Sequence, residues 1–412
     1  MKKLIWILAG IFIFRVVLAF IVWHPDVNNH IDWGIRFWEY GPKKFYAPET
    51  NIWSYTWPNQ PPGTTYMFAA IRKLFEVSFA GFWWINIKIP AFPSGIVTFF
   101  ETNLYPALLK LPAILADFGI AYILYKWTKK KWAPIIWLLN PVIWYNSAVW
   151  GQYDAVISFF ALLSFYLLTQ KKLTYSLLAI ILSLYIKASL LIFLPVWIIV
   201  AIRQKYKLSD YLVSTAYCLA AIILITLPFS GGDSVIWLYD LYVKKVFVQQ
   251  LHVITANAFN IWSAIAGIHE RPDTLPLLGL TYQYWGYILF TISFAPILYS
   301  VYKKQDQTTI AWALALTAFS SWMLLTNMHE RYLYPLFPYL TVLVTAGGVN
   351  LPTYWIISLL SLLNLYNFWW VPKIDWVVNF LSFGNRLMPR ILGFVNFLLF
   401  MFLYKRRVES YK

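Results

Sequence analysis

Two carboxylates follow closely on the first apolar segment of the chain, the run from Leu4 to Val22. Asp26 and Asp32 lie in the motif DVNNHIDW, and Asp26 stands seven residues before Trp33. A carboxylate held at a lipid surface can take the proton of a hydroxyl acceptor as a general base. We therefore expect a general base at Asp26, with Asp32 as the alternative. The competing interpretation is that Asp26 only caps a surface helix, which Asp does well.

A second polar group follows a break in an apolar segment. The motif NPVIWYNSAVWGQYD covers residues 140–154, and its Asn-Pro pair interrupts a helix. Breaks of this kind inside a membrane are tolerated where they line a cavity. Gln152 and Asp154 offer hydrogen bonds that suit sugar hydroxyls, and Trp150 lies beside them at the turn. A plain turn with an interfacial tryptophan is the alternative.

Cations occur in two further motifs. Lys187 lies in the apolar stretch LYIKASLLIFLP, where a lysine needs an anion or a route to water. Its side chain could also simply extend to the membrane surface. His329, Glu330 and Arg331 stand together in TNMHERYLYPLFP, where an apolar run resumes. This triplet indicates a site for an anion and a hydroxyl group, or else an ordinary charged turn.

The elements that carry these motifs are expected to be membrane helices. The 412 residues are 60% hydrophobic and only 12% charged, so lipid must be the solvent for most of the chain. Recurrent apolar segments predict an all-α polytopic membrane protein, a bundle of about 12–14 transmembrane helices in a single domain, residues 1–412. The segments 63–79 and 84–100 carry internal charges and fit either two spans or one re-entrant or interfacial hairpin. The single cysteine excludes a disulfide framework.

The basic residues predict the orientation. Lys and Arg clusters occur at alternate turns and at both ends of the chain, which predicts cytoplasmic termini and an active site on the outer face of the cell membrane. The net charge of +16 then reflects this bias and does not indicate nucleic acid. On the outer side, residues 23–62 are expected to form an amphipathic, aromatic catalytic loop with interfacial helices. Residues 229–280 form a second, long outer loop.

Two expectations concern lysines within apolar sequence. The stretch from Lys172 to Arg203 has a basic signal at each end, so two short helices must cross and return within it. That places Lys187 at the outer rim. Lys110 and Asp117 are two helical turns apart and are expected to face the bundle interior with a structural pairing role.

The order of these motifs resembles that of the GT-C glycosyltransferases, multi-span enzymes that use polyprenyl-phosphate sugars. DVNNHIDW is similar to the acidic first-loop motif of dolichyl-phosphate-glucose glucosyltransferases, and Tyr46 with NQPPG resembles their Tyr and Tyr-Pro-Pro segment. IKASLLIFLP and MHERYLYPLFP look like their Lys-containing and His-Glu-Lys segments, with Arg331 where Lys is usual. The segment 140–154 looks closer to bacterial and archaeal mannosyltransferase relatives. The motifs cover most of residues 1–340.

The resemblance implies a GT-C type bundle and inverting transfer of a mannose- or glucose-like hexose from a polyprenyl-phosphate monosaccharide to a hydroxyl of a lipid-linked or polymeric glycan. Asp26 would be the base. Lys187, Arg331 and His329 would bind the donor phosphate, whose negative charge grows as it leaves. Trp150, Gln152, Asp154 and Glu330 would contact sugar or acceptor. Neither a metal nor another cofactor is then needed.

Three other classes remain open. A lipid-linked glycan transporter or flippase would show charged groups at mid-membrane and two half-chain repeats. A lipid-diphosphate glycan polymerase or ligase would use a basic outer loop, and residues 229–280 contain Lys244, Lys245 and Arg271. A metal-dependent enzyme of the same superfamily would draw its oxygen ligands from the four candidate carboxylates, Asp26, Asp32, Asp154 and Glu330.

Overall fold

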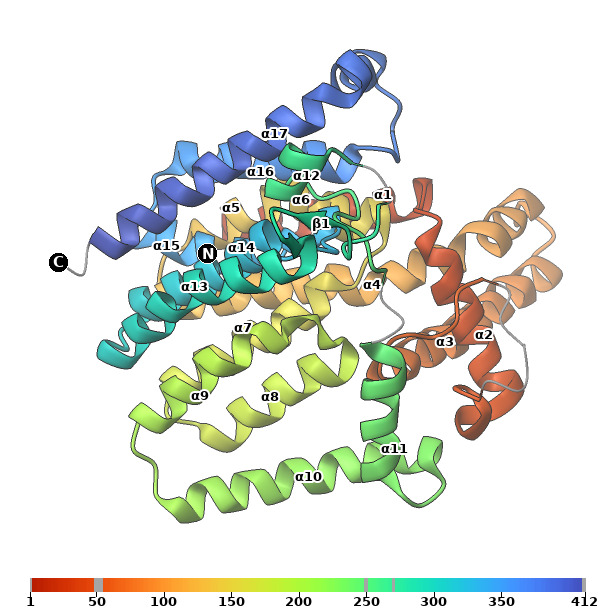
Figure 1. The fold of residues 1–412 in the computed structure, drawn as a ribbon. Coiled ribbons are helices and arrows are strands. Elements are labelled where there is room, and N and C mark those ends of the chain that lie inside the picture. The colour runs from red at the N-terminus through yellow and green to blue at the C-terminus, as the bar shows by residue number, and fades with distance from the viewer. Residues whose placement is uncertain (1, 48–54, 248–250, 269–270, 410–412) are drawn as a thin grey trace.

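Long apolar helices form the frame of the protein. The computed structural model describes residues 2–47, 55–247, 251–268 and 271–409, and Figure 1 shows an all-helical arrangement with one short pair of strands. Within the described residues, four helices are long and apolar enough to cross a membrane. A fifth is added if α1 (Lys2–Ile21) and α2 (Asp26–Lys44), bent by 85°, count as one span. The four are α4 (Ser94–Thr128), α10 (Leu208–Ser230), α13 (Tyr282–Lys303) and α17 (Asp375–Glu409).

Three of these helices leave most of their apolar surface uncovered by protein. Only 22% of the most apolar part of α10 is buried, with 28% for α13 and 33% for α17, against 61% for α4. Apolar surface on this scale is costly in water and favourable in lipid. The protein is therefore an all-α chain with several helices that can span a membrane, consistent with a multi-pass membrane protein, and α4 lies at its centre.

The prediction of 12–14 spans is not met by helix length. Some apolar segments are broken, at Asn140 and at Lys187, and others are fused, since α4 contains both the second half of 84–100 and the segment that follows. Several remaining apolar helices are shorter than the roughly 20 residues that cross a bilayer. These are α7 (Asp154–Thr169), α8 (Leu173–Ile186), η3 (Ala188–Phe193) with α9 (Leu194–Arg203), and α16 (Leu351–Tyr366).

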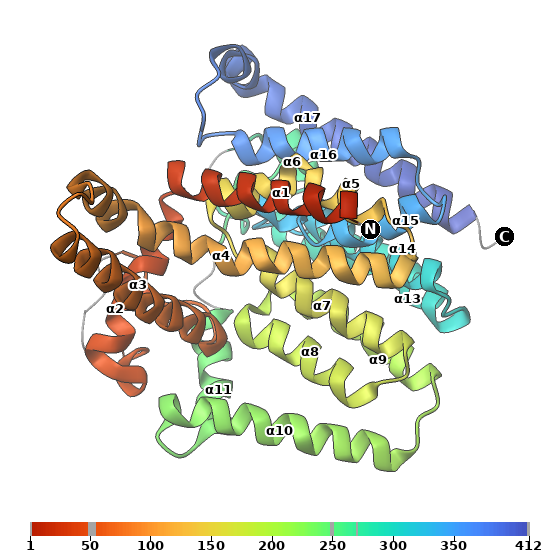
Figure 2. The same ribbon diagram turned by 180° about the vertical axis from the view of Figure 1, so that it is seen from behind.

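The doubtful segments 63–79 and 84–100 form a helical hairpin. α3 (Pro62–Lys88) packs antiparallel against the first turns of α4, and Figure 2 shows the two extending together from the bundle. The 35 residues of α4 span about 52 Å, well beyond the roughly 30 Å of a hydrocarbon core. α4 is therefore longer than one span requires, and its first turns pair with α3 as a hairpin.

Several basic turns lie at one end of the molecule. The start of α1, the end of α17 and the turns that precede α10 and α14 (Gln307–Leu324) lie on the same side in Figure 2. α2, α3 and α11 (Ser234–Leu241) lie toward the opposite end. Basic residues also occur there, at Lys43, Lys44 and Lys88, so the segregation expected from the sequence is only partial. Which end faces the cytoplasm stays a prediction.

The segment that follows α4 is a broken helix. It consists of α5 (Ala133–Leu139), α6 (Pro141–Trp144) and the π-helix η2 (Tyr145–Trp150). The break is stabilised by Asn140, whose Oδ1 accepts from the Val142 N–H at 3.0 Å and whose Nδ2 donates to the Tyr354 hydroxyl at 2.9 Å. Because π-helices often mark functional positions, the end of η2 is a natural place for a site.

The expected outer loops contain secondary structure. The 23–62 segment contains α2, and the 229–280 segment carries helices and a hairpin. Residues 48–54, 248–250 and 269–270 of these segments lie outside the described residues. The remaining elements are η4 (Tyr242–Val246), α12 (Ile261–Ala266), β1 (Pro276–Leu277), β2 (Leu280–Thr281), η5 (Glu330–Leu333) and α15 (Leu336–Thr345).

The buried charges of α4 do not pair with each other. Asp117 pairs with Arg15 of α1 and also accepts from the hydroxyls of Ser147 and Tyr334. Lys110 instead donates to backbone carbonyls of α1 and η2, including those of Ala19 at 3.0 Å and Ala148 at 3.1 Å. Both residues are fully buried, which confirms that they face the bundle interior, and each has its partners on neighbouring elements. These contacts join α1, α4 and η2 into one unit.

Candidate active site

Asp26 is the first residue of α2, where the chain leaves α1 at a sharp bend. His30, Trp33 and Phe37 follow on the same face of α2 and are buried. Positions seven residues apart face the same way after two helical turns, which explains the spacing between Asp26 and Trp33. The Trp33 indole donates to the carbonyl of Thr56 at 2.9 Å. This buried face fixes α2, and the bend leaves Asp26 one third exposed at its start.

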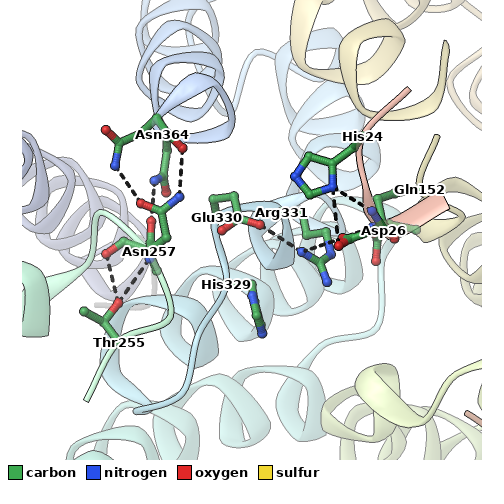
Figure 3. Close-up of polar contacts among 12 residues, drawn as sticks. His24, Asp26, Gln152, Thr255, Asn257, His329, Glu330, Arg331 and Asn364 are labelled. Atoms are coloured by element: carbon green, nitrogen blue, oxygen red, sulfur yellow. Dashed lines mark hydrogen bonds and ion pairs between the residues drawn. The ribbon is translucent and has the colours of Figure 1, made fainter. Parts of the chain in front are cut away.

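Three side chains surround the Asp26 carboxylate (Figure 3). Gln152 Nε2 donates to Asp26 Oδ2 at 2.7 Å, and an Arg331 guanidinium nitrogen lies 3.7 Å from the same oxygen. His24 Nδ1 lies 3.3 Å from Asp26 Oδ1 and accepts from the Asp26 backbone N–H at 3.1 Å. The contacts bring together three segments that are far apart in sequence: the start of α2, the turn after η2, and η5.

Arg331 is held between two carboxylates. Its Nη1 donates to Glu330 Oε1 at 2.9 Å and also faces Asp26. Aromatic rings flank its guanidinium carbon, with the Trp150 centroid at 6.0 Å and the Tyr332 centroid at 5.6 Å. Its Nε is buried and has no hydrogen-bond partner among the described residues. Arg331 therefore retains a free donor while its charge is shared by Asp26 and Glu330.

The charges around Arg331 tune the neighbouring groups. Burial alone would raise the pKa of Asp26, but the His24 contact and the Arg331 charge outweigh it and hold the pKa well below its usual range. Burial raises the pKa of Glu330, and Arg331 opposes this. Burial and the nearby cations lower the pKa of His329 well below its usual value, so His329 is neutral. Asp26 is thus ionised at rest, and His329 offers hydrogen bonds but no charge.

A cleft of about 740 Å³ opens over these groups. His24 stacks on Trp150 at 4.3 Å, and Trp369 lies 5.3 Å from Trp150, so aromatic rings form one wall. Arg386 also lines the cleft and is exposed, with its guanidinium 3.9 Å from the Phe368 ring centroid. Aromatic faces and convergent polar groups of this kind suit a sugar ring.

An asparagine network fixes the far wall of the cleft (Figure 3). Asn257 has a positive φ of 71° and accepts at its side-chain oxygen from Asn367 Nδ2 at 2.6 Å. Asn364 Nδ2 donates to the Asn257 carbonyl at 2.6 Å. Thr255 Oγ1 accepts from the Ala258 N–H at 3.1 Å within the same turn. The network fastens the outer segment that begins at residue 251 to the end of α16.

The turn after η2 depends on one glycine. Gly151 has a φ of +95°, and a Cβ there would lie 2.7 Å from Val27 Cγ2 and 3.3 Å from two carbons of Lys110. The His24 N–H donates to the Trp150 carbonyl at 3.1 Å and ties this turn to the entry of α2. The positive φ and the close approach together favour glycine, and they place Trp150 and Gln152 against Asp26.

Lys187 and Asp154 form a separate buried ion pair. Lys187 Nζ lies 2.8 Å from Asp154 Oδ1, and both side chains are almost fully buried. They line a cavity of about 230 Å³ whose lining does not include Asp26 or Arg331. The expectation that Lys187 and Arg331 share one pocket with Asp26 is therefore wrong. The cause is topological, because α7 and α8 are antiparallel neighbours and their ends bring Asp154 to Lys187.

Asp32 lies away from the cleft. It points from another face of α2, is buried, and pairs with Arg36 one helical turn along at 3.2 Å. Of the two candidate carboxylates, only Asp26 lines the cleft. The four candidate carboxylates also do not form one ligand set, and in the described part of the chain no three His, Cys, Asp or Glu side chains are grouped so that they could hold a metal ion.

The remaining predicted residues differ in role. Trp150 and Glu330 line the cleft as expected, but Glu330 binds Arg331, and Gln152 orients Asp26. His329 lies in the same cleft. The lining residues that had not been assigned a role include His24, Asn257, Trp369 and Arg386. Two of these residues could have been found from the sequence. His24 lies two residues before Asp26, and Arg386 follows the helix-breaking pair Gly384-Asn385.

The fold and the cleft together define a class, an all-α protein with several potential membrane spans and a polar, aromatic site at the end of its helices. No protein-family model matches the sequence, and no curated protein sequence matches it. The function is therefore argued from the site alone.

Proposed function

We propose that the protein is an integral-membrane inverting glycosyltransferase of the GT-C type. It moves a hexose from a polyprenyl-phosphate monosaccharide to a hydroxyl of a lipid-linked or polymeric glycan on the outer face of the membrane. The observation that carries the proposal is the pairing of Asp26 with Arg331 inside one aromatic cleft, with a distance of 3.7 Å between carboxylate and guanidinium. A base and a phosphate-binding cation are the two groups that this reaction requires.

The ion pair has to open during the reaction. In an in-line displacement the acceptor hydroxyl and the leaving phosphate lie on opposite sides of the anomeric carbon, so the base and the cation must separate. The donor phosphate offers Arg331 a new anionic partner, and Glu330 holds the guanidinium at 2.9 Å meanwhile. Asp26 keeps Gln152 as a donor at 2.7 Å, so it stays oriented when Arg331 turns away.

Donor binding then improves the base. Arg331 is one of the groups that lower the pKa of Asp26. When the donor phosphate takes that charge, the pKa rises toward its usual value and the carboxylate becomes a stronger proton acceptor. Binding of the donor before the acceptor follows from this order of events.

The transfer step forms one bond and breaks another. The acceptor oxygen bonds to the anomeric carbon while the bond from that carbon to the phosphate oxygen breaks, and the electron pair goes to the phosphate. The hydroxyl proton goes to Asp26. The phosphate changes from a singly charged diester to a more highly charged monoester, so Arg331 and the exposed cation Arg386 bind the transition state more strongly than the ground state. Trp150 and Trp369 provide faces for the hexose.

Reconstituted protein tests the proposal. Proteoliposomes are supplied with undecaprenyl-phosphate mannose or undecaprenyl-phosphate glucose, with a membrane glycolipid fraction as acceptor. Mass spectrometry should detect a hexose added to the acceptor and free undecaprenyl phosphate in equal amounts, with inversion at the anomeric carbon by NMR. Release of neither product from either donor, with correctly folded protein, rejects the proposal.

A further inference from the structure

A second polar cavity lies at the basic end of the bundle, away from the cleft. Its volume is about 640 Å³, and it opens where α4 ends and where the turns before α8, α10 and α14 meet. None of its lining residues belongs to the Asp26 cleft. The lining consists of Lys126, Trp127, Lys129, Tyr166, Thr169, Gln170, Lys171, Gln204, Gln305 and Gln307.

The chemistry of this lining favours an anion. It includes three lysines and four glutamines and no carboxylate. The acid between two of the glutamines, Asp306, uses its oxygens within its own turn, on Thr309 and on the N–H groups that cap α14. Lysines near a helix end also favour the helix dipole, which by itself would explain Lys126 and Lys129. The dipole does not explain why cations from two turns face one cavity.

Gln305 provides a second, independent observation. Its Nε2 is buried and has no hydrogen-bond partner in the described part of the chain. By contrast, Gln204 is satisfied, since its Nε2 donates to the Leu168 carbonyl at 2.9 Å and its Oε1 accepts from Tyr206 at 2.5 Å. An unsatisfied buried donor is costly, and an acceptor in the cavity would remove that cost. A ligand with negatively charged oxygen atoms would accept from the Gln305 amide and also pair with the lysines.

An apolar track leads away from the cavity along α4. Leu115 and Tyr122 are 53% and 61% exposed and, seven residues apart, share one face of α4, while Lys129 follows as the residue that ends the helix. Lys126 Nζ lies 5.6 Å from the Tyr122 ring centroid. A ligand with a negatively charged head and an apolar chain would bind the lysines with its head and cover this helix face with its chain.

We propose that this cavity binds the phosphate headgroup of an anionic phospholipid. The acyl chains lie on the exposed face of α4 below Tyr122, and the phosphate receives Lys126, Lys129, Lys171 and the Gln305 amide. Basic cavities between membrane helices bind anionic headgroups in this way. The site is independent of the transfer reaction, and it anchors the turns at which four helices meet.

Native mass spectrometry of the full chain tests the site, with phosphatidylglycerol and phosphatidylcholine as probes. The variant removes the three cavity lysines, and the control removes three lysines of the same turns that do not line the cavity, so both lose equal charge. The variant is Lys126→Gln/Lys129→Gln/Lys171→Gln, and the control is Lys130→Gln/Lys131→Gln/Lys172→Gln. We expect phosphatidylglycerol retention to fall about tenfold in the variant alone. Retention of phosphatidylcholine should stay low in all three proteins.

Two further measurements keep the outcome decisive. Gln305→Glu places a negative charge in the cavity and should lower phosphatidylglycerol retention without removing any lysine. Inorganic phosphate is added as a competitor, and it should displace the lipid poorly because it lacks the acyl chains. Equal loss in variant and control would mean a diffuse charge effect and overturn the proposal. Full displacement by phosphate would assign the site to a free anion instead and likewise overturn it.

Discussion

The variant Asp26→Asn tests the proposed general base with little change to the structure of the site. The amide side chain would keep the size of the carboxylate and an oxygen that can accept from Gln152, now at 2.7 Å. It loses only the charge and the ability to take a proton. Loss of a positioned general base costs about 10²- to 10⁴-fold in rate, which corresponds to about 3–5 kcal/mol in activation free energy.

The stability cost of Asp26→Asn should be much smaller. The carboxylate is one third exposed, and Arg331 retains Glu330 at 2.9 Å after the change. A partly exposed ion pair contributes on the order of 1 kcal/mol or less. Turnover should therefore fall far more than the melting temperature in detergent, and donor binding should stay largely intact or improve, because Arg331 gains freedom to bind phosphate.

Asp32→Asn is a matched control on the same helix. Asp32 also pairs with an arginine, Arg36, and that arginine also retains a glutamate, Glu39, at 2.8 Å. Both variants lose one negative charge beside an arginine, although Asp32 is 6% exposed against 33% for Asp26, and only Asp26 lies in the cleft. The assay is the initial rate of hexose transfer from undecaprenyl-phosphate hexose, with donor affinity measured separately. An inactive Asp32→Asn beside an Asp26→Asn with more than a tenth of normal turnover refutes the assignment of the base.

Three further variants test other parts of the site. Lys187→Met or Asp154→Asn leaves one buried charge of a 2.8 Å ion pair uncompensated, so each single variant should cost about 3–5 kcal/mol of stability. The double variant Lys187→Met/Asp154→Leu should recover most of this loss in thermal melts. Equal losses in the single and double variants would contradict the prediction. Gly151→Ala should cost about 1–3 kcal/mol of stability and lower turnover, because φ is +95° and the new Cβ would meet Val27. Gly10→Ala is the control, since there is open space around Gly10, and it should leave the melting temperature unchanged. Arg386→Gln should raise the donor KM about tenfold without changing the melting temperature, because this cation is exposed in the cleft; an unchanged KM removes it from the phosphate site.

Local sequence patterns predicted the parts of the site that depend on short-range geometry. Interfacial helices were expected within the amphipathic, aromatic segment 23–62, and α2 lies there with a buried aromatic face. The Asn140-Pro141 break and the turn at Gly151 are also where the sequence placed them. In each case the determinant is local, either helical periodicity or backbone preference, and few tertiary contacts can change it.

The pairing of charges could not be predicted in the same way. Lys187 was expected to meet a phosphate together with Arg331, but it meets Asp154, because α7 and α8 return on each other. Lys110 and Asp117 were expected to face the bundle interior with a structural pairing role, but the sequence did not name their partners: Asp117 pairs with Arg15, and Lys110 binds backbone carbonyls of α1 and η2. Ion pairs in apolar surroundings are decided by which helices are neighbours, and one sequence carries only weak information about that.

Helix number was overestimated for a related reason. Hydropathy marks segments that avoid water, and it does not distinguish a full span from a half-span or a buried core helix. α14 shows the difference, since it is buried by protein from Thr309 to Leu324. Conversely, α10 is apolar and mostly uncovered. Composition therefore indicated the solvent correctly for the chain as a whole but could not assign each segment to lipid or to protein.

In the proposed reaction, the resting charges would let the site favour the transition state over the bound donor. Arg331 already has Asp26 and Glu330 as acidic partners, and Lys187 has Asp154. A singly charged donor must compete with Asp26 for Arg331, so its ground state gains little from the exchange. The leaving phosphate carries more charge, and it wins that competition more strongly as the bond breaks. In the proposed transfer reaction, the ion pair between Asp26 and Arg331 would thus limit ground-state binding and leave more of the attraction to the transition state, which would raise turnover.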